Sequence, residues 1–423
     1  MTERKKILAM AYCVSPYRGS EYNVAWEWIT HMSKYHDLTV LYGMSDNHMG
    51  DNETMTKWLA ENELPHVRFV YVKPSKLANF LNCPNRHDIF VYTFYIAFKQ
   101  WHKCAYEVAK QLVKEENFDI VHMVGPIGYR EPGYLWKLGL PYVWGPIGGA
   151  NNSTKGLMKH LPFSGKIKHA FRTFANTIQL RYDRRVHQAL MHTDILLTAT
   201  SENQQKFQRF HGKDSIYLPE NAISQPIDLD NSKFLYNNTL ELLFVGRIDP
   251  GKNLTILLEA IAMMVNKKRI HLNVIGAGPE VPTCRKYAET HGISDLVTWH
   301  GMLPREKVLQ MYRSAHLHIV SSISEGNTTV IWEAMSNGVP TLSFDHCGMH
   351  DTLQGGAGIL VPISSEYEQN VKNLADALDQ FASTPNMPHD LAIKTIERAK
   401  HYTWEERVKI LNKIYDRVVE LKK

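Results

Sequence analysis

Cysteine is scarce in this sequence, and no two cysteines lie close together. The five residues are odd in number, and none belongs to a Cys-x-x-Cys pair. Zinc sites and redox motifs usually use such pairs, and a disulfide framework needs an even set. We therefore expect reduced thiols, typical of the cytosol, at Cys13, Cys83, Cys104, Cys284 and Cys347.

Long apolar runs are missing as well. No segment reaches the roughly 18–20 uninterrupted apolar residues that a membrane-spanning helix needs. Residues 4–14 imitate a signal peptide, but the small-residue triplet Ala9-Met10-Ala11 lies inside the apolar run instead of after it. A buried first strand explains this stretch better, and we expect a cytoplasmic protein.

Charge of one sign is not in large excess either. The formal net charge is +5, and 44% of the residues are hydrophobic. This surplus is too small to indicate a nucleic-acid partner, and the composition excludes wholesale disorder. A chain of 423 residues is also too long for one compact core and suits two domains.

Short apolar runs alternate with longer helical patterns along the whole chain, which is typical of parallel strands joined by crossover helices. The pattern begins at residues 7–11 and restarts at 242–245, after a polar stretch without periodicity. We therefore predict an α/β fold of two doubly wound Rossmann-like domains with a cleft between them. The expected division is a first domain at 1–223, a linker at 224–240, a second domain at 241–400 and a closing helix at 401–423 that returns to the first domain.

Two glycine-containing loops match nucleotide-binding motifs incompletely. Residues 246–253 nearly spell a Walker A loop, but Asn253 stands where Ser or Thr must hold Mg²⁺. The Gly276-Ala277-Gly278 segment lacks the third glycine of the dinucleotide fingerprint. Neither a P-loop NTPase nor a dehydrogenase is therefore favoured.

The first of these loops carries two cations, Arg247 and Lys252, between the end of a strand and the start of a helix. In open α/β sheets, ligands bind at this carboxyl edge. Two cations beside a helix N-terminus make a site for a diphosphate. Taken alone, the pair is explained equally well as two solvated loop cations.

A second loop, after the strand predicted at residues 317–320, adds two acids. Glu325 lies on the loop, and Glu333 lies one turn into the helix that follows. A carboxylate accepts two hydroxyl hydrogen bonds and so holds a vicinal diol of a sugar or ribose. Alternatively, Glu333 is only a favourable charge near a helix N-terminus. The N–H groups at the helix start suit a phosphate, and they belong to Thr328, Thr329 and Val330.

At this spacing, Arg247, Lys252, Glu325 and Glu333 resemble the signature of retaining GT-B glycosyltransferases of family 4, also called glycosyl transferases group 1. The resemblance covers the second domain and the closing helix. It implies that Arg247 and Lys252 bind the diphosphate of a nucleotide-sugar and act in catalysis together with Glu325. It also implies that Glu325 contacts the donor sugar and that Glu333 binds the ribose.

One departure from the family concerns the donor sugar. The family usually has Phe-Gly-Leu after the Glu-Gly pair, whereas Asn327-Thr328-Thr329 follow Gly326 here. We expect Gly326 and Asn327 to contact the donor sugar beside Glu325. The choice between a UDP-sugar and a GDP-sugar, and the identity of the sugar, stay open.

The first domain resembles the family less strongly. Gly19 and Ser20 follow the first strand, where relatives place a glycine-rich loop against the donor phosphates, although Ser20 also fits a helix N-cap. His122, at the end of a strand, aligns with a histidine that relatives place beside the reacting sugar, although strand-end histidines are often structural. Gly148 and Gly149 are expected to line the acceptor cleft with His122.

The resemblance implies an enzyme that transfers a hexose from a nucleotide-diphosphate sugar to a hydroxyl of a glycan acceptor. The acceptor is expected to be lipid-linked, in lipopolysaccharide or exopolysaccharide synthesis. Retention without an obvious nucleophilic carboxylate favours a front-face mechanism, in which the leaving diphosphate takes the acceptor's proton. A nucleotide-sugar epimerase of the same fold, a glycan phosphorylase and a non-catalytic sugar-nucleotide-binding protein remain alternatives.

No metal and no other cofactor is expected, because cationic side chains do the work of the metal. The segment Asp228-Leu229-Asp230 matches an Asp-x-Asp metal motif, but it falls in the predicted linker.

A basic amphipathic stretch is predicted as one helix at residues 167–191. With the preceding loop it carries a single acid, Asp183, interleaved apolar residues, and the cations Lys155, Lys159, Lys166, Lys168, Arg172, Arg181, Arg184 and Arg185. Such a stretch suits an anionic membrane surface, contacted through residues 166–186. The protein would then lie peripherally on the inner face of the plasma membrane and meet a polyisoprenoid-linked acceptor. A solvated helix with a core-facing apolar stripe explains the pattern equally well.

Overall fold

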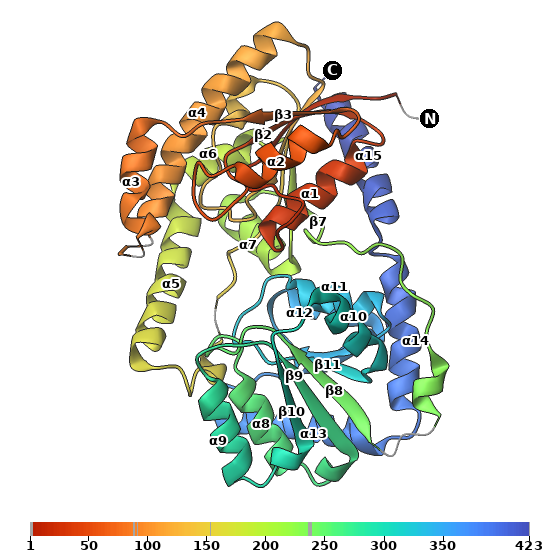
Figure 1. Ribbon diagram of the computed structural model, residues 1–423. Helices are drawn as coiled ribbons and strands as arrows, with labels where there is room; N and C mark the ends of the chain where they lie inside the picture. The colour runs from red at the N-terminus through yellow and green to blue at the C-terminus, as the bar shows by residue number, and fades with distance from the viewer. Residues whose placement is uncertain (1–2, 88, 91, 153, 236–238, 423) are drawn as a thin grey trace. The chain divides into compact units, whose positions relative to one another are not determined.

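The computed structural model divides into two compact units (Figure 1) and describes residues 3–87, 89–90, 92–152, 154–235 and 239–422. Unit 1 consists of Met1–Ala150, Asn176–Glu220 and Arg407–Lys423, and unit 2 of Asn151–Ala175 and Asn221–Glu406. The expected boundaries differ from this division at residues 151–175. This segment groups with unit 2, although the sequence pattern assigned it to the first domain.

Unit 1 contains a sheet of seven parallel strands in the order β3-β2-β1-β4-β5-β6-β7. Most are short apolar runs, as parallel strands covered on both faces require. In β1, Ile7 pairs with Leu38 of β2 on one side and with Ile120 of β4 on the other. The strands are β1 (Lys6–Ala11), β2 (Asp37–Tyr42), β3 (Val67–Tyr71), β4 (Ile120–Gly125), β5 (Tyr142–Ile147), β6 (Ile195–Thr198) and β7 (Ile216–Tyr217).

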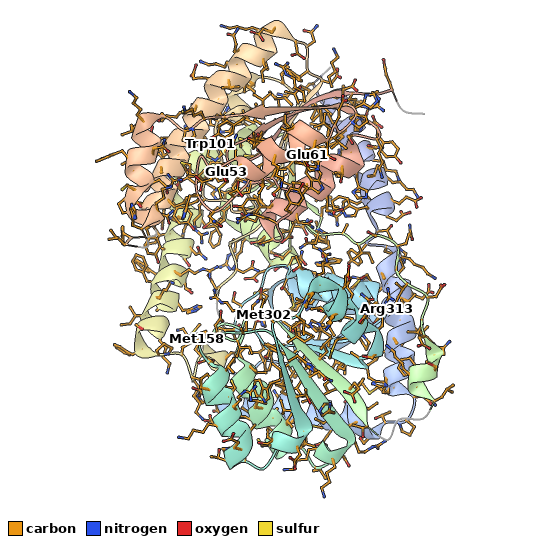
Figure 2. All side chains as sticks on the ribbon, in the orientation of Figure 1. Glu53, Glu61, Trp101, Met158, Met302 and Arg313 are labelled. Atoms are coloured by element: carbon orange, nitrogen blue, oxygen red, sulfur yellow. The ribbon has the colours of Figure 1, made fainter. Side chains whose placement is uncertain are left out.

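Helices cover this sheet with apolar residues that repeat every three or four positions. Trp101, labelled in Figure 2, has no exposed surface, and its indole N–H donates to the Val72 carbonyl at 2.8 Å. The helices of unit 1 are α1 (Glu21–Met32), α2 (Glu53–Glu61), α3 (Lys76–Arg86), α4 (Thr93–Glu115), the 3-10 helix η1 (Leu135–Leu138), α6 (Arg184–His192), α7 (Ser201–His211) and most of α15 (Trp404–Glu420).

The helix predicted at residues 167–191 is two helices in the structure. The first, α5 (Phe163–Tyr182), begins in unit 2 and ends in unit 1, and α6 follows it. The Asp183 carboxylate accepts the backbone N–H groups of Arg185 and Val186 at 2.8 and 3.3 Å. This N-cap starts a new helix, and so it interrupts the pattern that suggested a single one.

Unit 2 contains a sheet of six parallel strands in the order β10-β9-β8-β11-β12-β13. Its central pair is β8 and β11, in which Leu242 lies opposite Leu317. The strands are β8 (Leu240–Val245), β9 (Ile270–Ile275), β10 (Val297–Gly301), β11 (Leu317–Val320), β12 (Thr341–Phe344) and β13 (Gly358–Val361).

Neighbouring side chains of β8 enter different clusters, because successive residues of a strand point to opposite faces. Leu242 and Phe244 join the large core with α8 and α13, whereas Leu243 packs with Tyr312 of α10. The helices of unit 2 are α8 (Leu254–Met263), α9 (Val281–Thr290), α10 (Arg305–Ser314), α11 (Thr329–Ser336), α12 (Cys347–Leu353), α13 (Tyr367–Ser383), α14 (Met387–Lys400) and the 3-10 helices η2 (Lys155–Leu157), η3 (Asn231–Phe234), η4 (Lys267–Arg269), η5 (Ser294–Leu296) and η6 (Gln354–Gly356).

The segment 151–175 packs into unit 2 through η2. Leu157 and Leu161 are buried in the large core of this unit. The Gly156 carbonyl accepts from the Asn370 amide at 3.0 Å, and the Leu157 carbonyl accepts from Asn253 at 3.2 Å. A segment that follows β5 of unit 1 in sequence is therefore a structural part of unit 2.

Strand order reverses once in each sheet, between β1 and β4 and between β8 and β11. In open α/β sheets, ligands bind at the carboxyl ends of the strands beside such a switch point. The predicted fold class, two doubly wound Rossmann-like domains, is thus confirmed. Among the residues that the structure describes, no helix combines the length and the apolar character needed to cross a bilayer.

Candidate functional site

The loops that follow β8 and β9 touch through their backbones, and glycine makes this possible. A Cβ atom at Gly276, where φ is +140°, would lie 1.8 Å from the Gly246 carbonyl oxygen. A Cβ at Gly278 would lie 2.1 Å from the Ile248 carbonyl oxygen. These glycines therefore serve a close loop-to-loop contact, which explains why they resemble a dinucleotide fingerprint without completing it.

Asp249 orders the loop after β8 and both of its cations. Its Oδ1 accepts the backbone N–H groups of Gly251 and Lys252 at 2.9 and 3.0 Å. Its Oδ2 accepts from Arg247 Nε at 2.6 Å. This bond uses one of the five guanidinium N–H donors, and the Arg247 side chain is 76% exposed.

The sequence interpretation missed Asp249. An available signal was its position two residues before a glycine in a turn, where aspartate commonly accepts backbone N–H groups.

Lys252 and Glu325, which lie 73 residues apart in sequence, form an ion pair. The two loops that carry them are also joined by backbone, because Ile323 N–H donates to the Gly251 carbonyl at 2.9 Å. The Ser321 hydroxyl donates to the Lys252 carbonyl at 3.0 Å. The structure thus brings together a predicted diphosphate-binding cation and the carboxylate predicted to bind the donor sugar, at the switch point between β8 and β11.

Helix α11 begins directly after the loop that carries Glu325. Thr328 is its N-cap, in an extended conformation, and its side chain makes no capping hydrogen bond. The backbone N–H groups at the start of a helix lack partners within the helix, and they carry the positive end of its dipole. The first turn, at Thr329 and Val330, is therefore suited to an anion, as the sequence indicates.

Glu333 lies one turn further along α11. Burial raises the pKa of this carboxyl, and the nearby Arg305 guanidinium opposes the shift. One Arg305 nitrogen lies 4.0 Å from Glu333 Oε1. The carboxyl is thus partly withdrawn from water and has one cationic neighbour, while its predicted contact with a ribose stays a prediction.

The loop residue Asn327 is buried and bonded within unit 2. Its Oδ1 accepts from the Thr352 hydroxyl at 3.4 Å, and its carbonyl accepts from the Asn221 amide at 3.0 Å. These bonds fix the loop between Glu325 and α11. The predicted contacts of Gly326 and Asn327 with the donor sugar stay predictions.

In unit 1, Gly19 and Ser20 follow β1 as expected and lead into α1. Ser20 is the N-cap residue but has φ +57° and no side-chain capping bond, so the hydroxyl does not act as the alternative interpretation suggested. Burial raises the pKa of the adjacent Glu21 carboxyl, and a hydrogen bond from the Ile127 backbone opposes the shift. Glu21 also lines a small cavity with Pro126 and Ile127 after β4, so the loops after β1 and β4 meet at the switch point of this sheet.

The prediction that His122 lies in the acceptor cleft is wrong for this structure. His122 has no exposed surface. Its Nε2 lies 2.7 Å from the Gly145 carbonyl oxygen, so this nitrogen carries the proton, and Nδ1 accepts from the Tyr415 hydroxyl at 2.7 Å. Burial lowers the pKa of His122 to about 4. The imidazole is therefore a neutral core group that joins β4, β5 and α15.

The glycine pair at the end of β5 has a structural explanation within unit 1. Gly148 N–H donates to the Ile127 carbonyl at 2.7 Å, and Gly149 has φ +85°. The Gly149 carbonyl accepts from Arg130 at 3.2 Å. Gly148 and Gly149 are thus hydrogen-bonded to the segment after β4, and their predicted place in the acceptor cleft stays a prediction.

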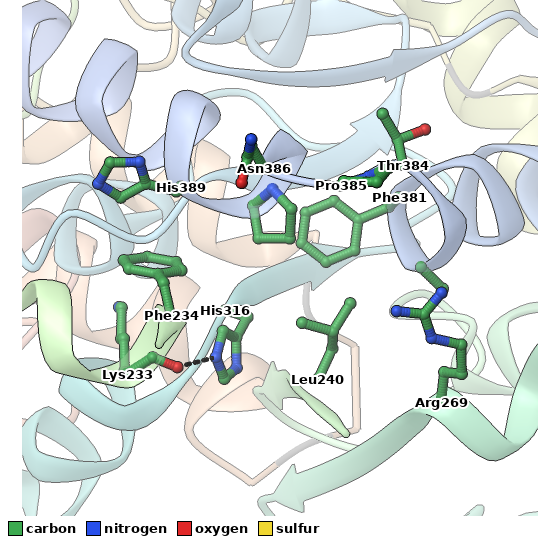
Figure 3. Close-up of a pocket in the computed structure, with 12 residues that line it drawn as sticks. Lys233, Phe234, Leu240, Arg269, His316, Phe381, Thr384, Pro385, Asn386 and His389 are labelled. Atoms are coloured by element: carbon green, nitrogen blue, oxygen red, sulfur yellow. Dashed lines mark hydrogen bonds between the residues drawn. The ribbon is translucent and has the colours of Figure 1, made fainter. Parts of the chain in front are cut away.

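The predicted linker contains a helix and borders a cavity. Asp230, of the Asp-x-Asp segment, accepts from Ser232 N–H at 2.9 Å and caps η3. A cavity of about 130 Å³ lies beside η3 at the amino ends of β8 and β11, where burial lowers the pKa of Lys233 to about 8 (Figure 3). This edge of the sheet is opposite the one that carries Arg247, Lys252 and Glu325, so the cavity is separate from the candidate site.

Known proteins are similar to this chain in sequence. Residues 228–401 match the family model described as glycosyl transferases group 1. A D-inositol 3-phosphate glycosyltransferase of Frankia alni is 32% identical over 174 residues, which are 38% of this chain and 42% of that protein. The putative colanic acid biosynthesis glycosyltransferase WcaL of Salmonella typhimurium is 26% identical over 196 residues, 43% of this chain and 46% of that protein. The chain thus spans less than half the length of these relatives.

Solved structures share the fold over nearly the whole chain. The lipopolysaccharide outer core galactosyltransferase WaaB aligns with a TM-score of 0.63 and 17% identity, covering 96% of this chain and 98% of that chain. Anabaena Alr3699/HepE in complex with UDP and glucose aligns with a TM-score of 0.60 and 14% identity, covering 98% and 100%. Residues 228–401 are therefore similar to the glycosyl transferases group 1, within a chain that has the two-domain GT-B fold.

Proposed function

We propose that this protein is a glycosyltransferase that moves a hexose from a nucleotide-diphosphate sugar to a hydroxyl of a glycan acceptor, with retention at the anomeric carbon. The observation that carries the proposal is the cluster of Arg247, Lys252 and Glu325 around the β8–β11 switch point. Cations that suit a diphosphate lie there beside a carboxylate that suits sugar hydroxyls. The family match of the same residues supports this chemistry.

The reaction that fits these groups is a front-face displacement. The acceptor oxygen bonds to the anomeric carbon on the face from which the diphosphate leaves. The bond from that carbon to the phosphate oxygen breaks, and the leaving phosphate takes the acceptor's proton. Arg247, Lys252 and the first turn of α11 stabilise the charge that grows on the diphosphate. One preorganised donor of this kind typically contributes about 3–4 kcal/mol to the lowering of the barrier.

Metal independence is part of the proposal, because the positive charge for the leaving group comes from Arg247, Lys252 and the helix start. We expect turnover to continue in EDTA after exhaustive dialysis. Loss of turnover in EDTA, restored by Mg²⁺ or Mn²⁺, would contradict this part of the proposal and leave the transfer reaction itself standing.

A UDP-sugar is the donor to test first, since similar folds were solved with UDP and glucose and with UDP and GlcNAc. The names of other similar proteins refer to colanic acid and lipopolysaccharide, which supports a lipid-linked glycan of surface polysaccharide synthesis as the acceptor. GDP-sugars remain the second candidate.

The test is a thermal-shift panel of UDP-, GDP- and ADP-sugars, followed by mass spectrometry of the products formed with lipid-linked glycan acceptors. A true donor class stabilises the protein by mass action, by about 2.7 kcal/mol at a hundredfold excess over Kd. Transfer of one hexose supports the proposal. Conversion of the donor without acceptor would instead identify an epimerase, and binding without any product would identify a non-catalytic sugar-nucleotide-binding protein.

A further inference from the structure

Helix α5 exposes a continuous apolar stripe along its whole length. Six large apolar side chains are between 42 and 80% exposed, and their spacing of three and four residues places them within an arc of about 100°. They are Phe163, Ile167, Phe171, Phe174, Ile178 and Tyr182.

The inward face of α5 is, by contrast, mostly polar. Within α5 only Asn176 and Leu180 are buried, and the half-buried residues just before them on the same face are His169 and Thr173. A surface helix of a globular protein normally shows the reverse, with its apolar stripe towards the core. The core-facing stripe that was one interpretation of the sequence is therefore wrong for this helix.

The charges of α5 are of one sign. Its 20 residues include no Asp or Glu. Of its exposed cations, Arg181 lies within the stripe, Lys166 and Lys168 flank it on its two sides, and Arg172 lies further round the helix. An apolar face with flanking cations matches the boundary layer of an anionic membrane, where apolar side chains enter the acyl region and cations meet the headgroups. A second copy of this helix fits poorly, because face-to-face pairing would bring two sets of four cations together.

We infer that α5 lies in the interface of an anionic membrane, with its aromatic stripe inserted among the lipids. Phe163, Phe171 and Phe174 supply most of the buried apolar area, and the four cations supply attraction to acidic headgroups. Arg184 and Arg185 of the predicted basic segment belong to α6, and Arg185 is bonded to Glu131 at 3.1 Å by two nitrogens. The protein surface that contacts the membrane is thus α5, without α6. Membrane binding requires no turnover, so it can be tested independently of the proposed reaction.

The test is flotation of the full chain with vesicles of phosphatidylcholine alone or with roughly one third phosphatidylglycerol. A stripe variant carries Ile167→Ser, Phe171→Ser and Phe174→Ser, and a charge variant carries Lys166→Gln, Lys168→Gln and Arg172→Gln. All six side chains are exposed, so both variants should keep the wild-type melting temperature. We expect wild type to float with the anionic vesicles, and the charge variant to partition roughly a hundredfold more weakly. The stripe variant should stay at the bottom of the gradient.

Matched controls remove the same number of groups elsewhere in unit 2. One carries Met263→Ser, Val265→Ser and Met302→Ser, three exposed apolar residues, of which Met302 is labelled in Figure 2. The other carries Lys267→Gln, Lys268→Gln and Arg269→Gln in η4. Both should float as wild type does. Equal loss of flotation in the controls would show a general effect of apolar area or net charge and would overturn the inference.

A second exposed apolar surface of the same chain is an alternative candidate for membrane contact. At the junction of α3 and α4, Phe80, Ile89 and Phe90 are 55–77% exposed. If the Phe80→Ser, Ile89→Ser, Phe90→Ser variant loses flotation while the stripe variant keeps it, α5 is not the membrane surface. Analytical ultracentrifugation tests self-association through α5. If wild type is a dimer, the stripe variant is a monomer, and both float equally, α5 is a dimer contact and the inference is overturned.

Discussion

Lys252 and Glu325 neutralise each other across the two loops that flank the β8–β11 switch point. Each was predicted to bind a different part of the donor, the lysine its diphosphate and the carboxylate its sugar. In the proposed function, the two negative charges of the donor diphosphate would compete with Glu325 for this cation. The following substitutions test how the site uses that arrangement.

Replacing Lys252 by Ala should lower kcat by roughly 10²–10³, because the growing charge on the leaving diphosphate loses one preorganised donor. The Glu325 side chain, which is 17% exposed, also loses its cation. Single-turnover rates at saturating donor measure the effect, and circular dichroism checks the fold. Lys268→Ala, in the exposed η4 helix, is the control. A wild-type kcat in the Lys252 variant would show that this lysine takes no part in catalysis.

Replacing Asp249 by Ala should weaken donor binding about tenfold and lower the free energy of unfolding by about 1–2 kcal/mol, since two backbone N–H groups and Arg247 lose their acceptor. Asp249→Asn keeps an acceptor for the backbone but not the charge that holds the guanidinium. We expect it to retain stability and still bind the donor less tightly. Denaturant unfolding and donor titration separate the two effects. Equal donor affinity in all three proteins contradicts a positioning role.

Replacing Gly276 by Ala should destabilise unit 2 by roughly 2–4 kcal/mol, because the new Cβ atom would lie 1.8 Å from a carbonyl oxygen at a positive φ. Gly19→Ala is the matched control, since no heavy atom lies within 4 Å of its added Cβ. The free energy of unfolding of the control should lie within about 0.5 kcal/mol of the wild-type value. If the Gly19 backbone meets the donor phosphates, the control variant should nevertheless bind the donor less tightly.

The buried His122 should make the stability of unit 1 depend on pH. Its folded pKa of about 4 lies below the unfolded value of about 6.5, so the unfolded chain binds the extra proton and stability falls as the pH drops below 6.5. Between pH 7 and pH 5 this residue should lower the free energy of unfolding by about 2 kcal/mol. Urea unfolding of wild type and His122→Gln at both values measures it. A pH dependence identical in the two proteins would show that His122 does not titrate in this range. The pH profile of kcat should be unchanged by the variant, because His122 is a core residue.

Much of the candidate site in unit 2 was predictable from sequence, because strand-ending loops at a switch point must meet at one edge of the sheet. Arg247, Lys252 and Glu325 each followed a recognisable strand. Asp249 was not found, since its role depends on where the turn places backbone N–H groups. His122 was misplaced for a related reason. A pattern along β4 does not show that Tyr415, 293 residues later, covers that face.

The path of residues 151–175 decides which fragments of this chain can be expressed alone. A piece cut at the boundaries of the family match, residues 228–401, would lack Leu157 and Leu161 and leave a hole in the apolar interior around α8 and α13. It would also leave Asn253 and Asn370 without the carbonyls to which they donate. A separately expressed unit 2 with an intact core would have to be built by joining the η2 segment to the later residues, in a connectivity that the natural chain does not have.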